Sequence, residues 1–107
     1  MGVAQGDIDR AVELFSGLGD ITTRKMMGGL CLYQDGTIFA ILDSGGRVYL
    51  KGKGDFAAEL EAAGCVQWTE TMKSGKVSHM PYWTLPDDAL DDPDTACDWA
   101  RRALEHL

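Results

Sequence analysis

Two apolar runs joined by a short polar turn form the most strongly patterned stretch of the chain, over residues 24–51. The turn contains Asp35 and Gly36, and an Asp-Gly pair is typical of a two-residue type I′ hairpin, because both central positions need a positive φ. If these two residues form the turn, a single register follows. The predicted pairs are Tyr33–Ile38, Leu32–Phe39, Cys31–Ala40 and Leu30–Ile41.

A second turn rich in glycine, over residues 43–46, leads into a predicted third strand over residues 47–51. One face of this three-stranded meander is then fully apolar and carries Leu30, Leu32, Phe39, Ile41, Val48 and Leu50. The opposite face is also largely apolar and carries Cys31, Tyr33, Ile38, Ala40, Leu42 and Tyr49. Because a solvated antiparallel sheet alternates apolar with polar residues, both faces need cover from helices, a partner chain or both.

Three helices are predicted around this sheet. Asp7 is expected to cap an N-terminal helix, whose apolar side chains recur at helical spacing. Asp55 is expected to cap a middle helix that ends at Gly64, where a C-terminal glycine is typical. The C-terminal helix has the clearest start, with Asp92 at the N-cap and Pro93 in the first helical position.

Two further strands are predicted over residues 66–70 and 77–85. Pro81 removes one backbone donor from the second of them, so it indicates a sheet edge or a bulge. The predicted fold class is therefore α+β, with an antiparallel meander sheet of about five strands packed with N-terminal, middle and C-terminal helices. A chain of 107 residues is expected to form a single domain over residues 1–107.

Charge changes the range of expected partners. The formal net charge is −7, which opposes the counterion release that drives unassisted binding to nucleic acid. The basic residues concentrate near the predicted strand ends, at Arg24, Lys25, Arg47, Lys51 and Lys53. These five are the candidate contacts with an acidic partner surface, and an ordinary solvated rim is the alternative.

No apolar run approaches the length of a membrane span, and the first helix is too charged for a signal peptide, so a cytoplasmic location is expected. The three cysteines are widely spaced and form no CxxC, so we expect them to be reduced and buried.

The chain shows no pattern of catalytic or metal-ligating residues. His79 has no neighbour at ligand spacing, and His106 lies beside the C-terminus. The acidic residues between 87 and 98 do not match a calcium-binding loop, and the glycines between 51 and 54 do not match a phosphate-binding loop. Neither an enzymatic activity, a metal nor a cofactor is therefore expected.

Aromatic residues support a different hypothesis. Trp68, Tyr82 and Trp83 could roof a pocket for a small molecule, which would make the chain a sensing or enzymatic module. Core packing is the default interpretation for most of these rings. A homodimer that buries the second sheet face is a third hypothesis.

Four blocks of the chain, in order, resemble the N-terminal domain of the TfoX/Sxy family. They are RKMMGG at 24–29, LCLYQDGTIFAIL at 30–42, EAAGC at 61–65 and MPYWTLPDDALDDPDTACDWARRAL at 80–104. The similarity runs from about Asp7 to Leu104. The chain departs from the family at Met27, where Phe is common, and it ends where full-length members continue into a C-terminal helical domain.

The resemblance implies a regulator of competence gene transcription, acting as a coactivator with the cyclic-AMP receptor protein. It implies no catalytic residues. The leading hypothesis is a non-enzymatic, TfoX-like interaction domain that acts through a transcription factor or polymerase and does not read DNA bases itself.

Overall fold

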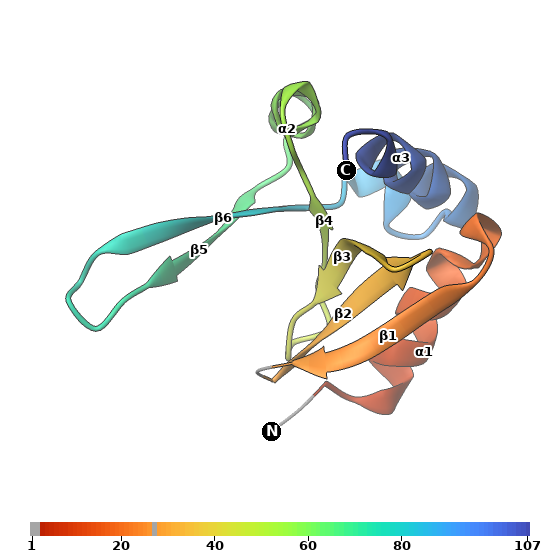
Figure 1. Ribbon diagram of the computed structural model, residues 1–107, viewed down its shortest axis with the longest axis horizontal. Coiled ribbons are helices and arrows are strands. Elements are labelled where there is room, and N and C mark those ends of the chain that lie inside the picture. Colours follow the sequence, from red (N-terminus) through yellow and green to blue (C-terminus); the bar gives the residue numbers. More distant parts are fainter. Residues whose placement is uncertain (1–2, 27) are drawn as a thin grey trace.

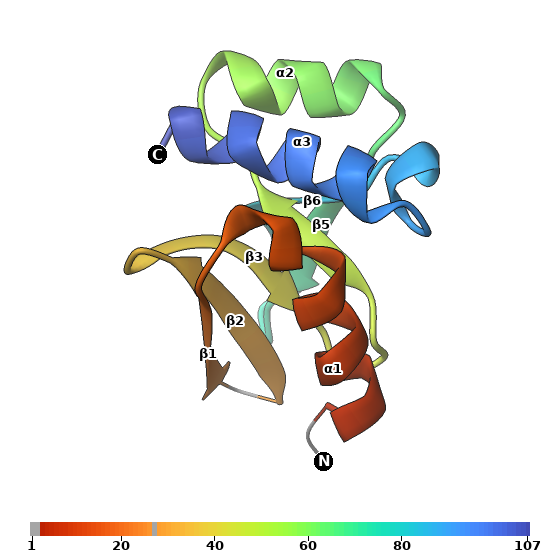
Figure 2. The same cartoon turned by 90° about the vertical axis from the view of Figure 1, so that its right-hand side faces the viewer.

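The computed structural model describes residues 3–26 and 28–107 and shows a twisted six-stranded antiparallel sheet with helices on one face (Figures 1 and 2). The helices are α1 (Gln5–Leu14), η1 (Ser16–Leu18), α2 (Asp55–Ala62), η2 (Asp87–Ala89) and α3 (Pro93–Glu105). The strands are β1 (Ile21–Met26), β2 (Gly29–Gln34), β3 (Thr37–Leu42), β4 (Val48–Lys51), β5 (Gln67–Thr71) and β6 (Val77–Thr84). Their order across the sheet is β1-β2-β3-β4-β6-β5. The α+β prediction is confirmed.

The sixth strand is β1, which adds one strand to the predicted number. It pairs with β2 along its whole length as an edge strand. Gly29, at the start of β2, allows a close backbone approach, because a Cβ there would lie 2.8 Å from the Leu42 carbonyl oxygen. Met27 lies outside the described residues.

The predicted type I′ turn between β2 and β3 is confirmed. Asp35 and Gly36 have φ angles of 52° and 78°. The first predicted pair, Tyr33 with Ile38, is also present.

A β-bulge follows that pair, and the rest of the predicted register is wrong. Leu32 pairs with Ala40, so Phe39 is the extra residue on β3. The remaining observed pairs are Cys31–Ile41 and Leu30–Leu42.

The bulge exchanges the two faces of β3 beyond residue 39, because a shift of one residue turns each following side chain to the other side of the sheet. Ala40 and Leu42 therefore lie in the core under the helices, and Ile41 lies on the opposite face, the reverse of the prediction. Phe39 stays in the core, where its ring meets Phe15 of α1 edge-on at 5.2 Å. The core residues contributed by β2, β3 and β4 are Leu30, Leu32, Phe39, Ala40, Leu42 and Leu50.

The N-terminal helix starts two residues before its predicted cap, and the middle helix starts at the predicted cap itself. α1 begins at Gln5 with Ala4 as its N-cap and no side-chain cap, so Asp7 lies in the first turn instead. α2 likewise begins at Asp55 itself, after Gly54. In both helices the acidic side chain favours the N-terminal end of the helix dipole without capping it.

The C-terminal end of α2 follows the prediction. Gly64 has a φ of 87°, and the backbone N–H of Cys65 donates to the Leu60 carbonyl at 3.0 Å. This is the Schellman arrangement that satisfies carbonyl groups at a helix end.

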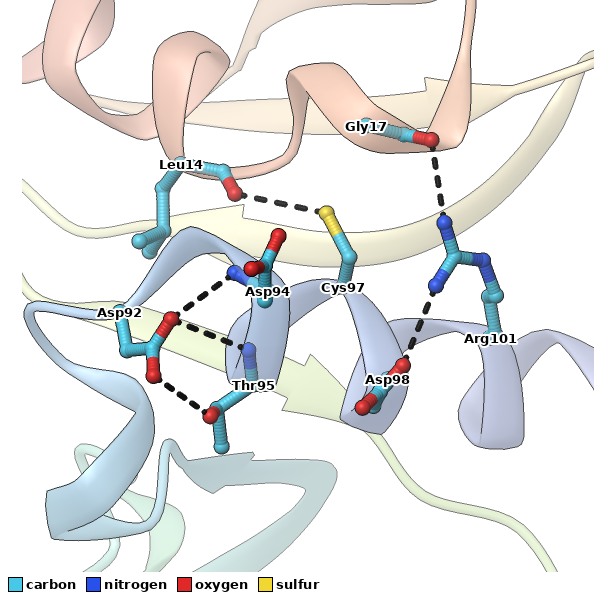
Figure 3. A network of polar contacts seen from close by, with 8 residues as sticks. All are labelled: Leu14, Gly17, Asp92, Asp94, Thr95, Cys97, Asp98 and Arg101. Atoms are coloured by element: carbon cyan, nitrogen blue, oxygen red, sulfur yellow. Dashed lines mark hydrogen bonds and ion pairs between the residues drawn. The ribbon is translucent and has the colours of Figure 1, made fainter.

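The predicted start of α3 is confirmed (Figure 3). One carboxylate oxygen of Asp92 accepts from the backbone N–H groups of Asp94 and Thr95, and the other accepts from the Thr95 hydroxyl. These hydrogen bonds favour the ionised carboxylate and lower the pKa of Asp92, with the Thr95 hydroxyl as the largest contribution.

This capping predicts a stability that depends on pH. Because the pKa of Asp92 is lower in the folded chain, its contribution is complete above the ordinary carboxyl pKa of about 4 and is lost as the pH falls through the lowered value. An Asp92→Asn variant keeps an N-cap acceptor that does not titrate. At pH 6 the wild type should have the larger free energy of unfolding in urea. As the pH falls to 2, this difference from the variant should disappear. Parallel curves for the two proteins would refute this role.

Side chains of α3 contact backbone carbonyl groups of the N-terminal segment and hold the two close together (Figure 3). The Cys97 thiol lies 3.5 Å from the Leu14 carbonyl, and the Arg101 guanidinium donates to the Gly17 carbonyl at 3.1 Å. A Cβ on Gly17 would lie 3.2 Å from the Cys97 sulfur, so small residues permit the approach. With α1 and α3 placed together in this way, the helices cover a single sheet face (Figure 2).

The β5–β6 hairpin extends away from the helices (Figure 1). β4 pairs only with residues 82–84 of β6, so the outer part of the hairpin is a two-stranded ribbon. Pro81 lies where the β5–β6 register shifts, so of the two predicted settings, a sheet edge or a bulge, the structure shows the bulge.

Candidate functional site

A row of side chains crosses five strands on the sheet face that the helices leave uncovered. The pairs along this row place Arg24, Cys31, Ile41, Tyr49 and Thr84 on the same side of the sheet. In β2, β3, β4 and β6, the neighbouring positions along the strand point into the helix-covered core. The bulge in β3 contributes to this row, because it turns Ile41 outward.

Aromatic rings gather on the same face. Tyr49 meets Trp68 at 5.1 Å between ring centroids, and Trp68 meets Tyr82 at 6.5 Å. We call this surface the open face, and it carries Arg24, Cys31, Tyr33, Ile38, Ile41, Tyr49, Lys51, Trp68 and Tyr82. All four of its aromatic rings are half-buried. They offer the amphipathic contact area that is enriched at protein interfaces.

Two tyrosines of the open face have raised pKa values. Burial is the main cause at both, and Asp43 raises the pKa of Tyr49 further while Arg47 lowers it. Cys31 and Tyr33 add to the rise in the pKa of Tyr82. Both phenols therefore stay protonated at neutral pH and can donate hydrogen bonds to a partner.

The structure spreads the five basic residues predicted to contact a partner. Arg24 and Lys51 lie on the open face, and Lys25 lies on the other side of β1, in the pair with Leu30. The other two are Arg47 in the turn before β4 and Lys53 in the loop before α2. Among the described residues, the ion pairs are formed by other cations, namely Arg10, Arg101 and Arg102.

The three residues of the alternative pocket are not brought together. Trp68 and Tyr82 lie on the open face, whereas Trp83 pairs with Leu50 in the helix-covered core. A Cβ on Gly52 would lie 2.8 Å from the Trp83 ring, so glycine is needed for this packing.

Two shallow cavities lie elsewhere. One of about 300 Å³ lies between α1, the turn before β4 and the residues that flank η2, with Asp7, Arg10, Arg47 and Asp91 among its lining residues. The other, of about 410 Å³, is lined by residues of α3, η1 and β2. Neither cavity is lined by the aromatic residues of the open face.

Groups able to carry out covalent or metal chemistry are dispersed. Within residues 3–26 and 28–107, no three His, Cys, Asp or Glu side chains gather closely enough to hold a metal ion. Cys31 and Cys97 are buried as predicted, but Cys65 is only half-buried. Burial and the nearby Asp87 and Asp88 raise the pKa of the Cys65 thiol, which disfavours the reactive thiolate.

The sequence placed Tyr33 and Tyr49 on the second sheet face, which the homodimer hypothesis buries, and it did not predict which other aromatic residues would join these two. Their shared face was recognised from strand alternation, but Trp68 and Tyr82 come from a distant hairpin and join them only in the folded sheet. The turn that follows β5 carried no signal for how far that hairpin would project.

The comparisons with known proteins identify a family for the chain. The family model of the TfoX N-terminal domain matches residues 13–107, and no curated protein matches the chain. In the part of the chain that the structure describes, every helix is too short or too polar to cross a membrane. With nearly its whole length matched, the chain belongs to the TfoX N-terminal domain family.

Proposed function

We propose that the chain is a non-enzymatic regulatory module that binds a protein partner through its open face and acts in transcription. The TfoX/Sxy regulators of competence suggest the cyclic-AMP receptor protein as that partner, with RNA polymerase as the other candidate. The family is not a known enzyme family.

The open face is the observation that carries this proposal. It presents four half-buried aromatic rings on a sheet surface without a covering helix. A surface of this kind gains from burial against a partner, because aromatic groups dominate the binding energy of protein interfaces.

Charge supports a protein partner over DNA. The overall charge of −7 repels a phosphate backbone, whereas Arg24 and Lys51 give the open face its own cations. An acidic patch on the partner would complement these two residues.

The test is fluorescence anisotropy of a labelled competence-type promoter at two salt concentrations. The protein is titrated alone and then with the cyclic-AMP receptor protein of the same organism. Enhancement only when the receptor protein is present would support the coactivator role. Tight binding by the protein alone would refute it, and no effect in either titration would exclude this receptor protein as the partner.

Charge reversal on the open face should weaken the partner complex. We expect Arg24→Glu combined with Lys51→Glu to reduce affinity roughly ten-fold, since each exposed ion pair contributes up to about 1 kcal/mol. The single variant Arg24→Glu is compared with its matched control Lys25→Glu, because the two make the same change of charge at neighbouring residues on opposite sides of β1. Equal losses in both proteins would indicate a general effect of charge and would exclude the open face as the contact.

The contact between Trp68 and Tyr82 favours one second candidate, a small-molecule-binding or enzymatic module with a site on the open face. A thermal-shift screen against a metabolite library tests it. Stabilisation that is lost in a Trp68→Ala variant would support this candidate, and a screen without stabilised hits would count against it.

A further inference from the structure

The outer part of the β5–β6 hairpin has an edge without a partner strand. We call residues 69–79 the arm. β6 pairs with β4 only through residues 82–84, and the last bond on that side joins the Gly52 N–H to the Pro81 carbonyl at 3.0 Å. Beyond Pro81, the arm projects from the sheet, and none of the described strands or helices lies beside β6 on the side away from β5 (Figure 1).

The hydrogen bonds around the arm show which backbone groups face this edge. Met72 donates to the Lys76 carbonyl at the turn, so the next hydrogen-bonded pair is Glu70 with Ser78. The backbone groups of Val77 and His79 then point away from β5. The Pro81 carbonyl accepts from Gly52, so it also points away from β5. This hydrogen bond independently shows that the backbone groups of odd-numbered residues in β6 face the β4 side.

The arm also exposes apolar side chains. Met72 is 55% exposed and Val77 is 48% exposed. A two-stranded ribbon is at best marginally stable by itself in water, so the arm would gain from a third strand.

This edge differs from the two outer edges of the sheet in its side-chain charge. β1 carries Arg24 and Lys25, and β5 carries Glu70, which are charges of the kind that keep edge strands from pairing with copies of themselves. The edge from Val77 to Met80 carries no Asp, Glu, Lys or Arg.

We infer that two copies of the chain associate through this edge, with β6 pairing antiparallel to β6 of the second copy. The register pairs Val77 with His79 of the second copy, and Ser78 with Ser78 of the second copy. This register uses the outward N–H and C=O groups of both Val77 and His79, which gives four hydrogen bonds across the interface.

The same register avoids the contacts that would oppose a dimer. Lys76 faces Met80 of the second copy, so no like charges lie opposite one another along the paired strands. Pro81 ends the pairing, because it has no N–H and its carbonyl already accepts from Gly52. The contact is isologous, so it closes at two copies and does not propagate. This inference does not depend on the proposed function.

Analytical ultracentrifugation over micromolar concentrations tests the dimer. The wild type should reach twice the 11.6 kDa mass of the chain. His79→Pro removes an outward N–H and should leave a monomer. The matched control is Thr69→Pro, which changes the residue opposite His79 on the outer edge of β5 and should leave the dimer intact.

A cross-linking experiment fixes the register even if His79→Pro fails to fold. In a Cys65→Ser background, Ser78→Cys should form an intermolecular disulfide under mild oxidation, because directly opposed residues in a non-hydrogen-bonded pair suit disulfide geometry. Glu70→Cys, which lies opposite Ser78 within the arm, should remain reduced. A monomeric wild type, or cross-linking of Glu70→Cys as readily as Ser78→Cys, would overturn the inference. So would a dimer that dissociates on Tyr33→Glu, a change on the open face, but survives His79→Pro.

Discussion

Replacing Phe39 with alanine should lower the free energy of unfolding by about 3–5 kcal/mol. Phe39 is fully buried at the β-bulge, and its ring packs edge-on against Phe15. Because a bulge fixes the backbone locally, we expect little collapse of the cavity that the missing ring would leave. Small proteins have about 5–15 kcal/mol of stability in total, so the variant should unfold at much lower urea concentrations.

The neighbouring residue provides the control. Ile38→Ala removes a side chain that is only half-buried on the open face, so the loss should be clearly smaller. A double-mutant cycle between Phe39→Leu and Phe15→Leu should show a coupling of about 0.5–1.5 kcal/mol from the edge-on rings. Equal losses for Phe39→Ala and Ile38→Ala would contradict the placement of Phe39 in the core.

Much of the fold follows from local rules that the sequence displays. The Asp35-Gly36 turn, the Gly64 helix end and the Asp92 cap each depend on a few adjacent residues, and all three predictions are confirmed. Pro81 similarly indicates its bulge, because a missing donor is a property of one residue.

The errors come from tertiary contacts with no local signal. Nothing in the run of apolar residues from Thr37 to Leu42 distinguishes a bulged strand from a regular one, because every position can be buried on either face. β1 is an exposed strand, so it lacks the alternating pattern that identifies half-buried strands.

The candidate site shows the same division. The apolar character of both sheet faces predicted cover from helices, a partner chain or both, and the structure covers one face with helices and leaves the open face without one. The basic residues were grouped by their positions near strand ends, but pairing with Leu30 turns Lys25 away from Arg24. The alternation of side chains across a strand thus determines which charges can act together.

The bulge itself can be tested by introducing a lysine on either face of β3. Leu42→Lys should be strongly destabilising, with a loss on the order of 3–5 kcal/mol, because it places an unpaired ammonium group in the helix-covered core. Leu42 is 1% exposed and pairs with Leu30 beneath the helices. Soluble expression and thermal unfolding followed by circular dichroism would measure the effect.

Ile41→Lys should be tolerated better, although Ile41 is only 9% exposed. It lies on the open face beside half-buried Tyr49, where a flexible four-carbon stem can cover apolar surface while its ammonium reaches water. Leu42→Met and Ile41→Met are uncharged controls and should each cost less than about 1.5 kcal/mol. A regular hairpin without the bulge predicts the reverse order for the two lysine variants, so their ranking alone decides which face of β3 meets the helices.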